Sequence, residues 1–255
     1  MDDRATLTRF EGLASTYDRF RPTYPAAVFS TLLPGLGASP LVADVGCGTG
    51  ISSRLLRVAG ARVIGIDPSQ DMLRQARERS GGDGPPIEFR QGTGEATGLA
   101  DGSVDVVLAA QAFHWFDPPR ALAEFHRILR PGGRAALLWN LRVADGGFTD
   151  DYTRIVVSAA ESLDPSARAG RESLDAPLRA SSLFRDAVVH DFDSPQTLDE
   201  EGAVGRATSA SYFPRTEPER SARLEELRAA FRRHATDGVA TLAHVARLTM
   251  ATRVP

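Results

Sequence analysis

The turn Gly46–Gly50 constrains the fold of this chain more than any other segment. It lies between a short apolar run, Leu41–Val45, and a helical stretch, Ile51–Val58. Glycine at every second position permits positive φ angles and a close approach of the backbone to a ligand. A strand that enters a helix through such a turn is typical of α/β proteins, in which strands of a parallel sheet alternate with helices.

Strands and helices continue to alternate up to residue 139. Further strands are expected at Arg62–Ile66, Ile87–Arg90, Val104–Ala109 and Ala135–Trp139. Helices are expected at Ser69–Arg79, with Ser69 as the N-cap, and at Pro118–Leu129. Because this order of elements builds parallel sheets with right-handed crossovers, the sequence predicts an α/β fold.

The segments on either side of this core have weaker patterns. We expect helices at Ala5–Phe20, Pro25–Leu33, Asp150–Ser162 and Pro218–His234, and strands at Ala187–Phe192 and Val239–Met250. Residues 1–255 are expected to form a single domain. It would comprise an N-terminal helical lid (1–36), a core (37–140), and substrate-side insertions with C-terminal strands (141–255).

The composition excludes several classes of function. All 30 basic residues are arginine, so no lysine is present for a pyridoxal Schiff base or a Walker A phosphate loop. Cys47 is the only cysteine, which excludes an internal disulfide and a multi-cysteine zinc site. The formal net charge of −3 argues against a nucleic-acid partner. No apolar run approaches the roughly 18 residues of a membrane helix, so we expect a cytoplasmic protein with no membrane partner.

The spacing of the glycines separates two kinds of cofactor. The turn follows the pattern G-x-G-x-G, whereas the dinucleotide fingerprint G-x-G-x-x-G would need a glycine where Ile51 stands. Asp44 precedes the first glycine, and its carboxylate would repel a pyrophosphate but tolerate a cationic ligand. Asp67 follows the second strand, where an acid can accept hydrogen bonds from both hydroxyls of a ribose. The alternative is that Asp67 only caps the helix that follows.

Four ordered motifs now carry a family resemblance. They are Asp44–Gly50, Val63–Ser69, Gly92–Leu99 followed by Asp101–Asp105, and Arg130–Gly133. Between Phe10 and Asn140 the chain resembles the class I S-adenosylmethionine (SAM)-dependent methyltransferases, in particular the small-molecule group that includes trans-aconitate methyltransferase-like proteins. This resemblance implies a Rossmann-like, doubly wound sheet of seven strands. The sheet would be mostly parallel, with one antiparallel strand near the C-terminus, and an N-terminal helical lid would accompany it.

The resemblance also implies which residues would contact SAM, the expected cofactor. Gly46, Cys47 and Gly48 would line the methionine moiety. Asp44 would hold this loop or meet the SAM ammonium group, and Asp67 would bind the ribose hydroxyls.

Further contacts would come from the segments after the other strands and from the lid. Pro68 would lie beside the adenosine, the turn of Thr93, Gly94 and Glu95 would meet the adenine, and Gln111 would lie beside the methionine end. Many relatives carry aspartate where Thr93 stands. In the lid, the matching positions are Tyr17 and Arg21. Arg21 is a candidate for the SAM carboxylate, or it pairs with Asp18 at the surface.

His114 is the candidate catalytic residue. It lies in the segment that follows the fourth strand, and the resemblance extends to this segment because its His-Trp pair recurs in the group. A base is needed only where the methyl acceptor must lose a proton. His114 would act as that base or orient the substrate; the alternative is that it only fixes the loop. The other four histidines show no metal-ligand spacing, so we expect no metal.

Together these expectations predict a SAM-dependent methyltransferase, of bacterial origin, that acts on an O, N or C nucleophile of a small molecule. It would be a monomer or a homodimer. One alternative is a SAM-binding protein of the same fold that catalyses another reaction, such as a cyclisation. An NAD-dependent oxidoreductase and a pure binding module are the remaining alternatives.

Overall fold

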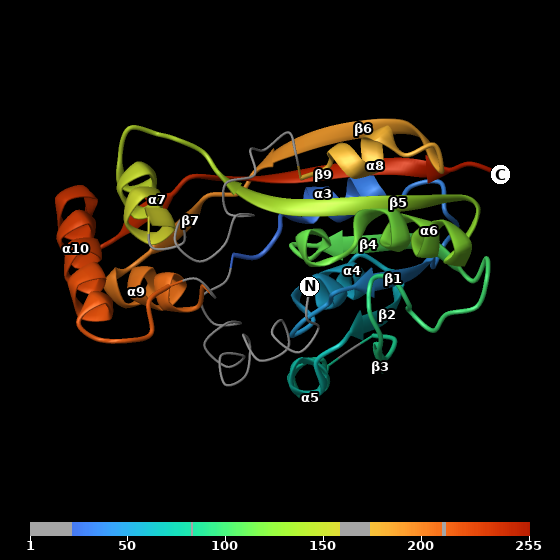
Figure 1. Cartoon of the computed structure of the whole chain (residues 1–255), viewed down its shortest axis with the longest axis horizontal. Coiled ribbons are helices and arrows are strands. Elements are labelled where there is room, and N and C mark those ends of the chain that lie inside the picture. The colour runs from blue at the N-terminus through green and yellow to red at the C-terminus, as the bar shows by residue number, and fades with distance from the viewer. Residues whose placement is uncertain (1–21, 83, 159–173, 211–212) are drawn as a thin grey trace. The chain divides into compact units, whose positions relative to one another are not determined.

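The computed structural model describes residues 22–82, 84–158, 174–210 and 213–255, and the chain divides into two compact units (Figure 1). The core unit comprises Thr23–Asn140, Gly170–Phe192 and Ala246–Pro255. The accessory unit comprises Leu141–Ala169 and Asp193–Val245, together with Met1–Pro22. The expected first helix, Ala5–Phe20, lies outside the described residues. The single-domain organisation stays a prediction.

A seven-stranded sheet forms the framework of the core unit. Its strands, in spatial order, are β3 (Glu88–Gln91), β2 (Arg62–Asp67), β1 (Leu41–Val45), β4 (Val104–Ala110), β5 (Leu129–Arg142), β9 (His244–Arg253) and β6 (Phe184–Asp193). The first five strands pair in parallel. Strand β9 lies between β5 and β6 and is antiparallel to both (Figure 1). The predicted Rossmann-like sheet, mostly parallel with one antiparallel strand near the C-terminus, is therefore confirmed.

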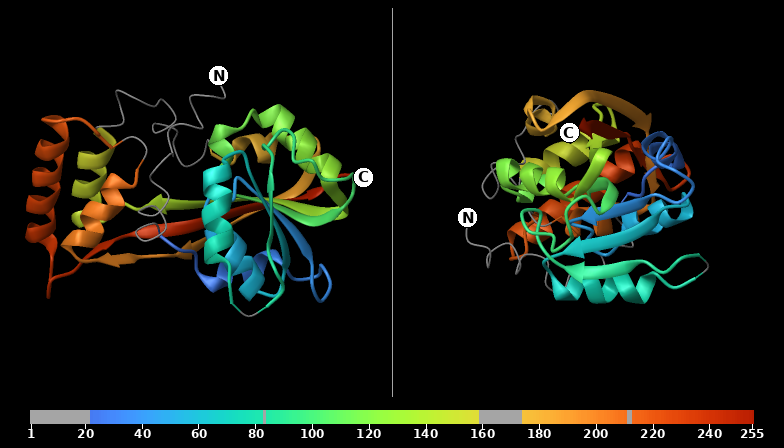
Figure 2. Two further views of the ribbon diagram at one scale, coloured as in Figure 1. Left: turned by 90° about the horizontal axis from the view of Figure 1, so that it is seen from below. Right: turned by 90° about the vertical axis from the view of Figure 1, so that its right-hand side faces the viewer.

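Helices cover both faces of this sheet (Figure 2). Helices α3 (Ala26–Leu32) and α4 (Ile51–Val58) pack on one face. Their side chains share an apolar cluster with strands β1, β2, β4, β5 and β9, formed in part by Phe29, Leu56, Val42, Val63, Leu108, Leu138 and Leu248. Helix α6 (Pro118–Ile128) lies on the opposite face (Figure 2). Helices α5 (Gln70–Arg79) and α8 (Ala176–Ala180) complete this unit.

The strand order places a switch point beside β1. From β1 the chain proceeds outward through β2 to β3 and then crosses to β4 on the other side. Residue Asp44 pairs with Gly65 of β2 and with Leu108 of β4, so the three strands end close together. Ligands of open α/β sheets bind at the carboxyl ends of the strands at such a point.

The accessory unit is built on helices. It contains α7 (Phe148–Ser158), α9 (Glu200–Thr208) and α10 (Glu219–His234), with a small antiparallel pair of β7 (Gln196–Leu198) and β8 (Ala240–Leu242). These elements share their own apolar cluster, which includes Tyr152, Ile155, Leu227 and Phe231.

One predicted strand, Val239–Met250, is wrong as a single element. The structure divides it into β8 and β9, which end and begin on either side of Ala243. The two parts have different partners, because β8 pairs with β7 whereas β9 enters the seven-stranded sheet. The predicted helix Asp150–Ser162 begins earlier, at Phe148, and its last residues lie outside the described part. Elements α8, α9 and β7 were not predicted.

Candidate active site

Four segments with the predicted residues meet at the carboxyl edge of the sheet. The glycine turn follows β1, Asp67 ends β2, the turn at Thr93 follows β3, and Gln111 follows β4. All of them belong to the core unit. Tyr17 and Arg21, the two predicted lid contacts, lie outside the described residues.

The glycine turn is tightly packed at one end and open at its middle. Gly46 and Gly48 have φ angles of 73° and 53°. The Gly46 N–H donates to the Ile66 carbonyl at 2.7 Å, which ties the turn to β2. A Cβ atom at Gly46 would lie 2.4 Å from the Cβ of Ala112, whereas a Cβ at Gly48 would meet no atom within 4 Å. The turn therefore leaves open space beside Gly48.

Asp44 is fully buried and keeps one oxygen unpaired. Its Oδ2 accepts hydrogen bonds from the hydroxyls of Ser52 and Ser53, at 2.7 and 2.5 Å. Its Oδ1 has no hydrogen-bond partner within the part of the chain that the structure describes. Burial raises the pKa of Asp44 to about 6, although the two serines lower it. A buried acceptor without a partner is rare in folded proteins and fits a cationic or hydrogen-bond-donating group of a ligand.

Replacing Asp44 with asparagine is expected to stabilise the protein in a pH-dependent manner. Because the folded pKa lies above the value of 3.8 in the unfolded chain, the wild-type carboxylate destabilises the fold as the pH rises from about 4 to 6. Below this window the variant and the wild type should be equally stable. Above it the variant should gain up to about 3 kcal/mol, at ~1.36 kcal/mol per pKa unit. Urea unfolding at pH 4 and pH 7, with exposed Asp237→Asn as the control, measures this gain; an equal effect at both pH values would contradict it.

Asp67 connects the glycine turn to the start of α5. Its Oδ2 accepts from the Gly48 N–H and its Oδ1 from the Ser69 N–H, both at 2.9 Å. Burial raises the pKa of Asp67, and these two hydrogen bonds partly offset the effect. The N-cap of α5 is Ser69, as predicted, because its hydroxyl accepts from the Met72 N–H. Each oxygen of Asp67 retains capacity for another donor, so the carboxylate fits a pair of ribose hydroxyls.

The turn after β3 is stabilised by hydrogen bonds within the turn and by one to the start of α6. The Thr93 N–H donates to the Ala96 carbonyl, and the Ala96 N–H donates to the Thr93 hydroxyl, both at 3.1 Å. The Glu95 carboxylate accepts from the Asp117 N–H at 2.7 Å, at the start of α6. A Cβ at Gly94 would lie 2.6 Å from the Phe116 ring, so only glycine fits beneath that ring.

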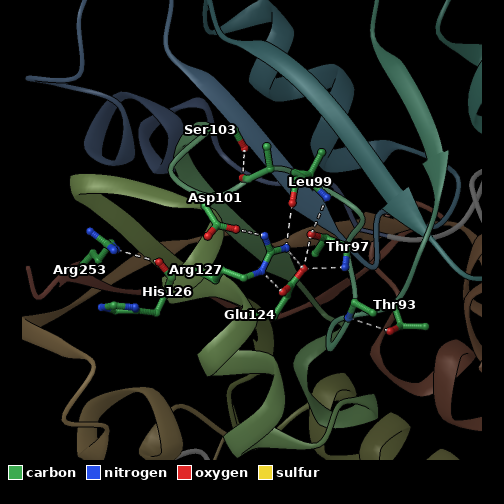
Figure 3. A network of polar contacts seen from close by, with 11 residues as sticks. Thr93, Thr97, Leu99, Asp101, Ser103, Glu124, His126, Arg127 and Arg253 are labelled. Atoms are coloured by element: carbon green, nitrogen blue, oxygen red, sulfur yellow. Dashed lines mark hydrogen bonds and ion pairs between the residues drawn. The ribbon is translucent and has the colours of Figure 1, made fainter.

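A buried carboxylate organises the rest of this loop (Figure 3). Glu124 Oε1 accepts from the Thr97 N–H at 2.8 Å and from the Thr97 hydroxyl at 2.5 Å. Arg127 donates to both oxygens of Glu124, at 2.8 Å each, and to the Leu99 carbonyl, also at 2.8 Å. Helix α6 thereby fixes the loop that follows Glu95. No local pattern in the sequence points to Glu124. Arg127 lies three residues further along the same helix, but Thr97, which Glu124 holds in place, lies 27 residues earlier.

Replacing Glu124 with glutamine is expected to destabilise the protein by about 1–3 kcal/mol at pH 7, since the Arg127 guanidinium would face an uncharged amide. Burial raises the pKa of Glu124, but hydrogen bonds from Arg127 and Thr97 outweigh it and hold the pKa below its usual value. The difference should therefore disappear as the pH falls below this lowered pKa. Urea unfolding between pH 7 and pH 3 measures it, with exposed Glu78→Gln as the control. A pH-independent difference would contradict this interpretation.

The segment after β4 presents the candidate catalytic histidine. Gln111 has a φ of 56°, unusual for a residue other than glycine. Its Nε2 donates to the Asn140 carbonyl at 3.3 Å. The exposed His114 lies on a short 3₁₀ helix, with its ring centroid 4.6 Å from that of Trp115 and 5.5 Å from that of Trp139. Trp139 is buried, and its Nε1 has no hydrogen-bond partner among the described residues.

Cys47 and Pro68, two of the predicted cofactor contacts, already interact with other groups of the protein. The side chain of Cys47 is buried in a small apolar cluster with Leu73, Ala76 and Phe89, and burial raises the pKa of its thiol. Only the backbone of Cys47 therefore remains for a ligand in the turn. The Pro68 carbonyl accepts from the Gln91 side chain at 3.0 Å.

Within residues 22–82, 84–158, 174–210 and 213–255, no three His, Cys, Asp or Glu side chains come together in a way that could hold a metal ion. No helix in these ranges is long and apolar enough to cross a membrane.

Known proteins share this arrangement of motifs and strands. Residues 43–137 match the methyltransferase domain family. An uncharacterised methyltransferase of Mycobacterium tuberculosis is 40% identical over 147 residues, which are 58% of this chain and 58% of that protein. The malonyl-[acyl-carrier protein] O-methyltransferase of Pectobacterium atrosepticum is 38% identical over 149 residues, 58% of this chain and 56% of that protein. The chain thus matches a little over half the length of these curated relatives.

One solved structure is similar over almost its full length. It is a candidate type II methyltransferase from Anaeromyxobacter dehalogenans, with a TM-score of 0.69 and 26% identity. The similarity covers 92% of this chain and 97% of that one. Family, relatives and fold agree: this chain contains a class I SAM-dependent methyltransferase domain.

Proposed function

We propose that the protein transfers a methyl group from SAM to an O, N or C nucleophile of a small molecule. The observation that carries this proposal is the Oδ1 of buried Asp44, which has no partner among the described residues. Asp44 lies in β1 at the switch point, just before the turn that leaves open space at Gly48. A dinucleotide site would place a pyrophosphate beside this carboxylate, where like charges repel. A cation or a hydrogen-bond donor fits there, as the ammonium group of SAM would.

The chain's own residues would bind and align rather than activate the cofactor. When bound, SAM supplies a methyl group that its sulfonium already makes reactive. Asp67 would accept hydrogen bonds from the ribose hydroxyls, and the turn of Thr93, Gly94 and Glu95 would border the adenine. Gln111, held by its bond to the Asn140 carbonyl, would position the methionine end. Alignment of the reacting atoms and exclusion of water then provide much of the rate enhancement.

The binding proposal is tested by calorimetric titration of the full chain with SAM, S-adenosylhomocysteine and NAD. Micromolar binding of the two adenosyl ligands, with no binding of NAD, is expected. Binding of NAD alone would replace the proposal with an oxidoreductase. A third outcome is that SAM binds and is consumed, but no labelled methyl group reaches a small-molecule acceptor. That outcome would favour another reaction on the same fold, such as a cyclisation.

His114 is expected to matter for turnover rather than for cofactor binding. As a general base, it would take a proton from the acceptor, and such a group contributes roughly 10²–10⁴-fold to the rate. His114→Ala should therefore lower kcat by about this factor and remove the acidic limb of the pH profile, while SAM affinity stays unchanged. His190→Ala, at a partly buried histidine of β6, is the control. An unchanged pH profile with a higher KM would show that His114 orients the substrate instead.

A further inference from the structure

A second buried polar site lies in the accessory unit, at the first residue of β9. His244 is only 3% exposed. Its Nδ1 lies 3.1 Å from the Leu242 carbonyl, which can only accept, so Nδ1 carries the proton. In the neutral ring the lone pair is then on Nε2, and Nε2 has no partner within the described residues. A buried acceptor left without a donor costs about 1–3 kcal/mol.

Two arginines of the same unit act on this imidazole. Arg206 of α9 is buried, with 7% of its surface exposed. Arg142 lies at the end of β5, with its guanidinium carbon 5.8 Å from the centre of the Tyr152 ring. The Val143 N–H donates to the Ala243 carbonyl at 2.9 Å, so the chain next to Arg142 lies beside the chain next to His244.

The electrostatics of this group favour a negatively charged occupant. The pKa of His244 is lowered to about 4, first by burial and then by the charges of Arg206 and Arg142, although the hydrogen bond to the Leu242 carbonyl raises it. At neutral pH the imidazole is therefore uncharged, and it lies in a positive environment made by two guanidinium groups. An oxyanion beside them would be stabilised by both charges, in a region where water screens little.

We propose that His244, Arg142 and Arg206 form a binding site for a ligand that carries an oxyanion, either a carboxylate or a phosphate, next to a hydroxyl group. The guanidinium groups donate to the oxyanion, and the hydroxyl donates to Nε2 of His244. Each guanidinium has five N–H donors, so either arginine can keep its other contacts and still bind the anion.

The test follows the His244 imidazole by ¹⁵N NMR in the full chain, with His244→Gln used to assign its signal among the five histidines. The probes are hydroxymalonate, malonate, inorganic phosphate and neutral malonamide, at constant ionic strength. Hydroxymalonate or phosphate should shift the signal saturably, and malonate, which lacks the hydroxyl, should bind more weakly. The tighter of the two anions identifies a carboxylate or a phosphate as the natural group.

Variants separate this site from a general effect of charge. Arg142→Gln should weaken anion binding by about tenfold or more. Arg228 is exposed on α10 and pairs with Glu200, so Arg228→Gln should leave anion binding unchanged. The proposal is overturned if no anion shifts the His244 signal of the wild type, or if Arg142→Gln binds as tightly as the wild type. SAM titration of the same samples keeps the two proposals apart: intact SAM binding with no response of His244 removes only this anion site.

Discussion

Asp67→Ala is expected to weaken the binding of SAM and S-adenosylhomocysteine by roughly a hundredfold or more. Two hydrogen bonds from ribose hydroxyls to a carboxylate contribute about 1.5–3 kcal/mol each, and 1.4 kcal/mol corresponds to a tenfold change in affinity. The variant also loses the acceptor that holds the Gly48 and Ser69 N–H groups, so the turn and the start of α5 would be less well positioned. Calorimetry on the purified variant measures the loss.

The controls for this experiment separate ligand binding from stability. Glu78→Ala removes an exposed acid from α5, the helix that follows Asp67, and should leave SAM affinity unchanged. Asp67→Asn keeps one acceptor oxygen and should show an intermediate loss. If Asp67→Ala remains folded and binds SAM as the wild type does, Asp67 only braces the turn and the ribose role is wrong.

The sequence predicted the core unit well because its signals are local. Helix α4 has the predicted bounds, Ile51–Val58, and Ser69 caps α5 as expected. Both depend on residues within a few positions along the chain. The fold class followed from the same alternation of strands and helices, since short connections leave few topologies for a parallel sheet.

The parts that were missed depend on contacts distant in the sequence. The break in the strand at Ala243 arises because β8 pairs with β7, more than 40 residues earlier, while β9 enters the main sheet. Burial of the Cys47 thiol depends on Phe89 of β3. Ser52 and Ser53, by contrast, are visible in the sequence. They place two hydroxyls in the first turn of the helix after the glycine turn, and both donate to Asp44.

Gly46→Ala and Gly48→Ala form a matched pair with the largest expected difference in stability. Both glycines have positive φ, so alanine at either position costs about 1–2 kcal/mol in backbone strain. Only at Gly46 would the new Cβ collide, at 2.4 Å from the Cβ of Ala112. Overpacking typically costs a further 1–3 kcal/mol. We therefore expect Gly46→Ala to lose about 2–5 kcal/mol, a large part of the about 5–15 kcal/mol that stabilises most domains, and Gly48→Ala only about 1–2 kcal/mol.

Urea unfolding of the two variants measures this difference, and a third variant tests its cause. Adding Ala112→Gly to Gly46→Ala removes the colliding methyl group and should restore part of the loss, as a coupling between the two positions. Gly48→Ala should instead fold normally and bind SAM at least about tenfold more weakly, because its methyl group enters the open space of the turn. If both single variants lose the same stability, backbone strain alone determines the turn; if Gly48→Ala keeps full SAM affinity, the cofactor does not approach the turn at Gly48.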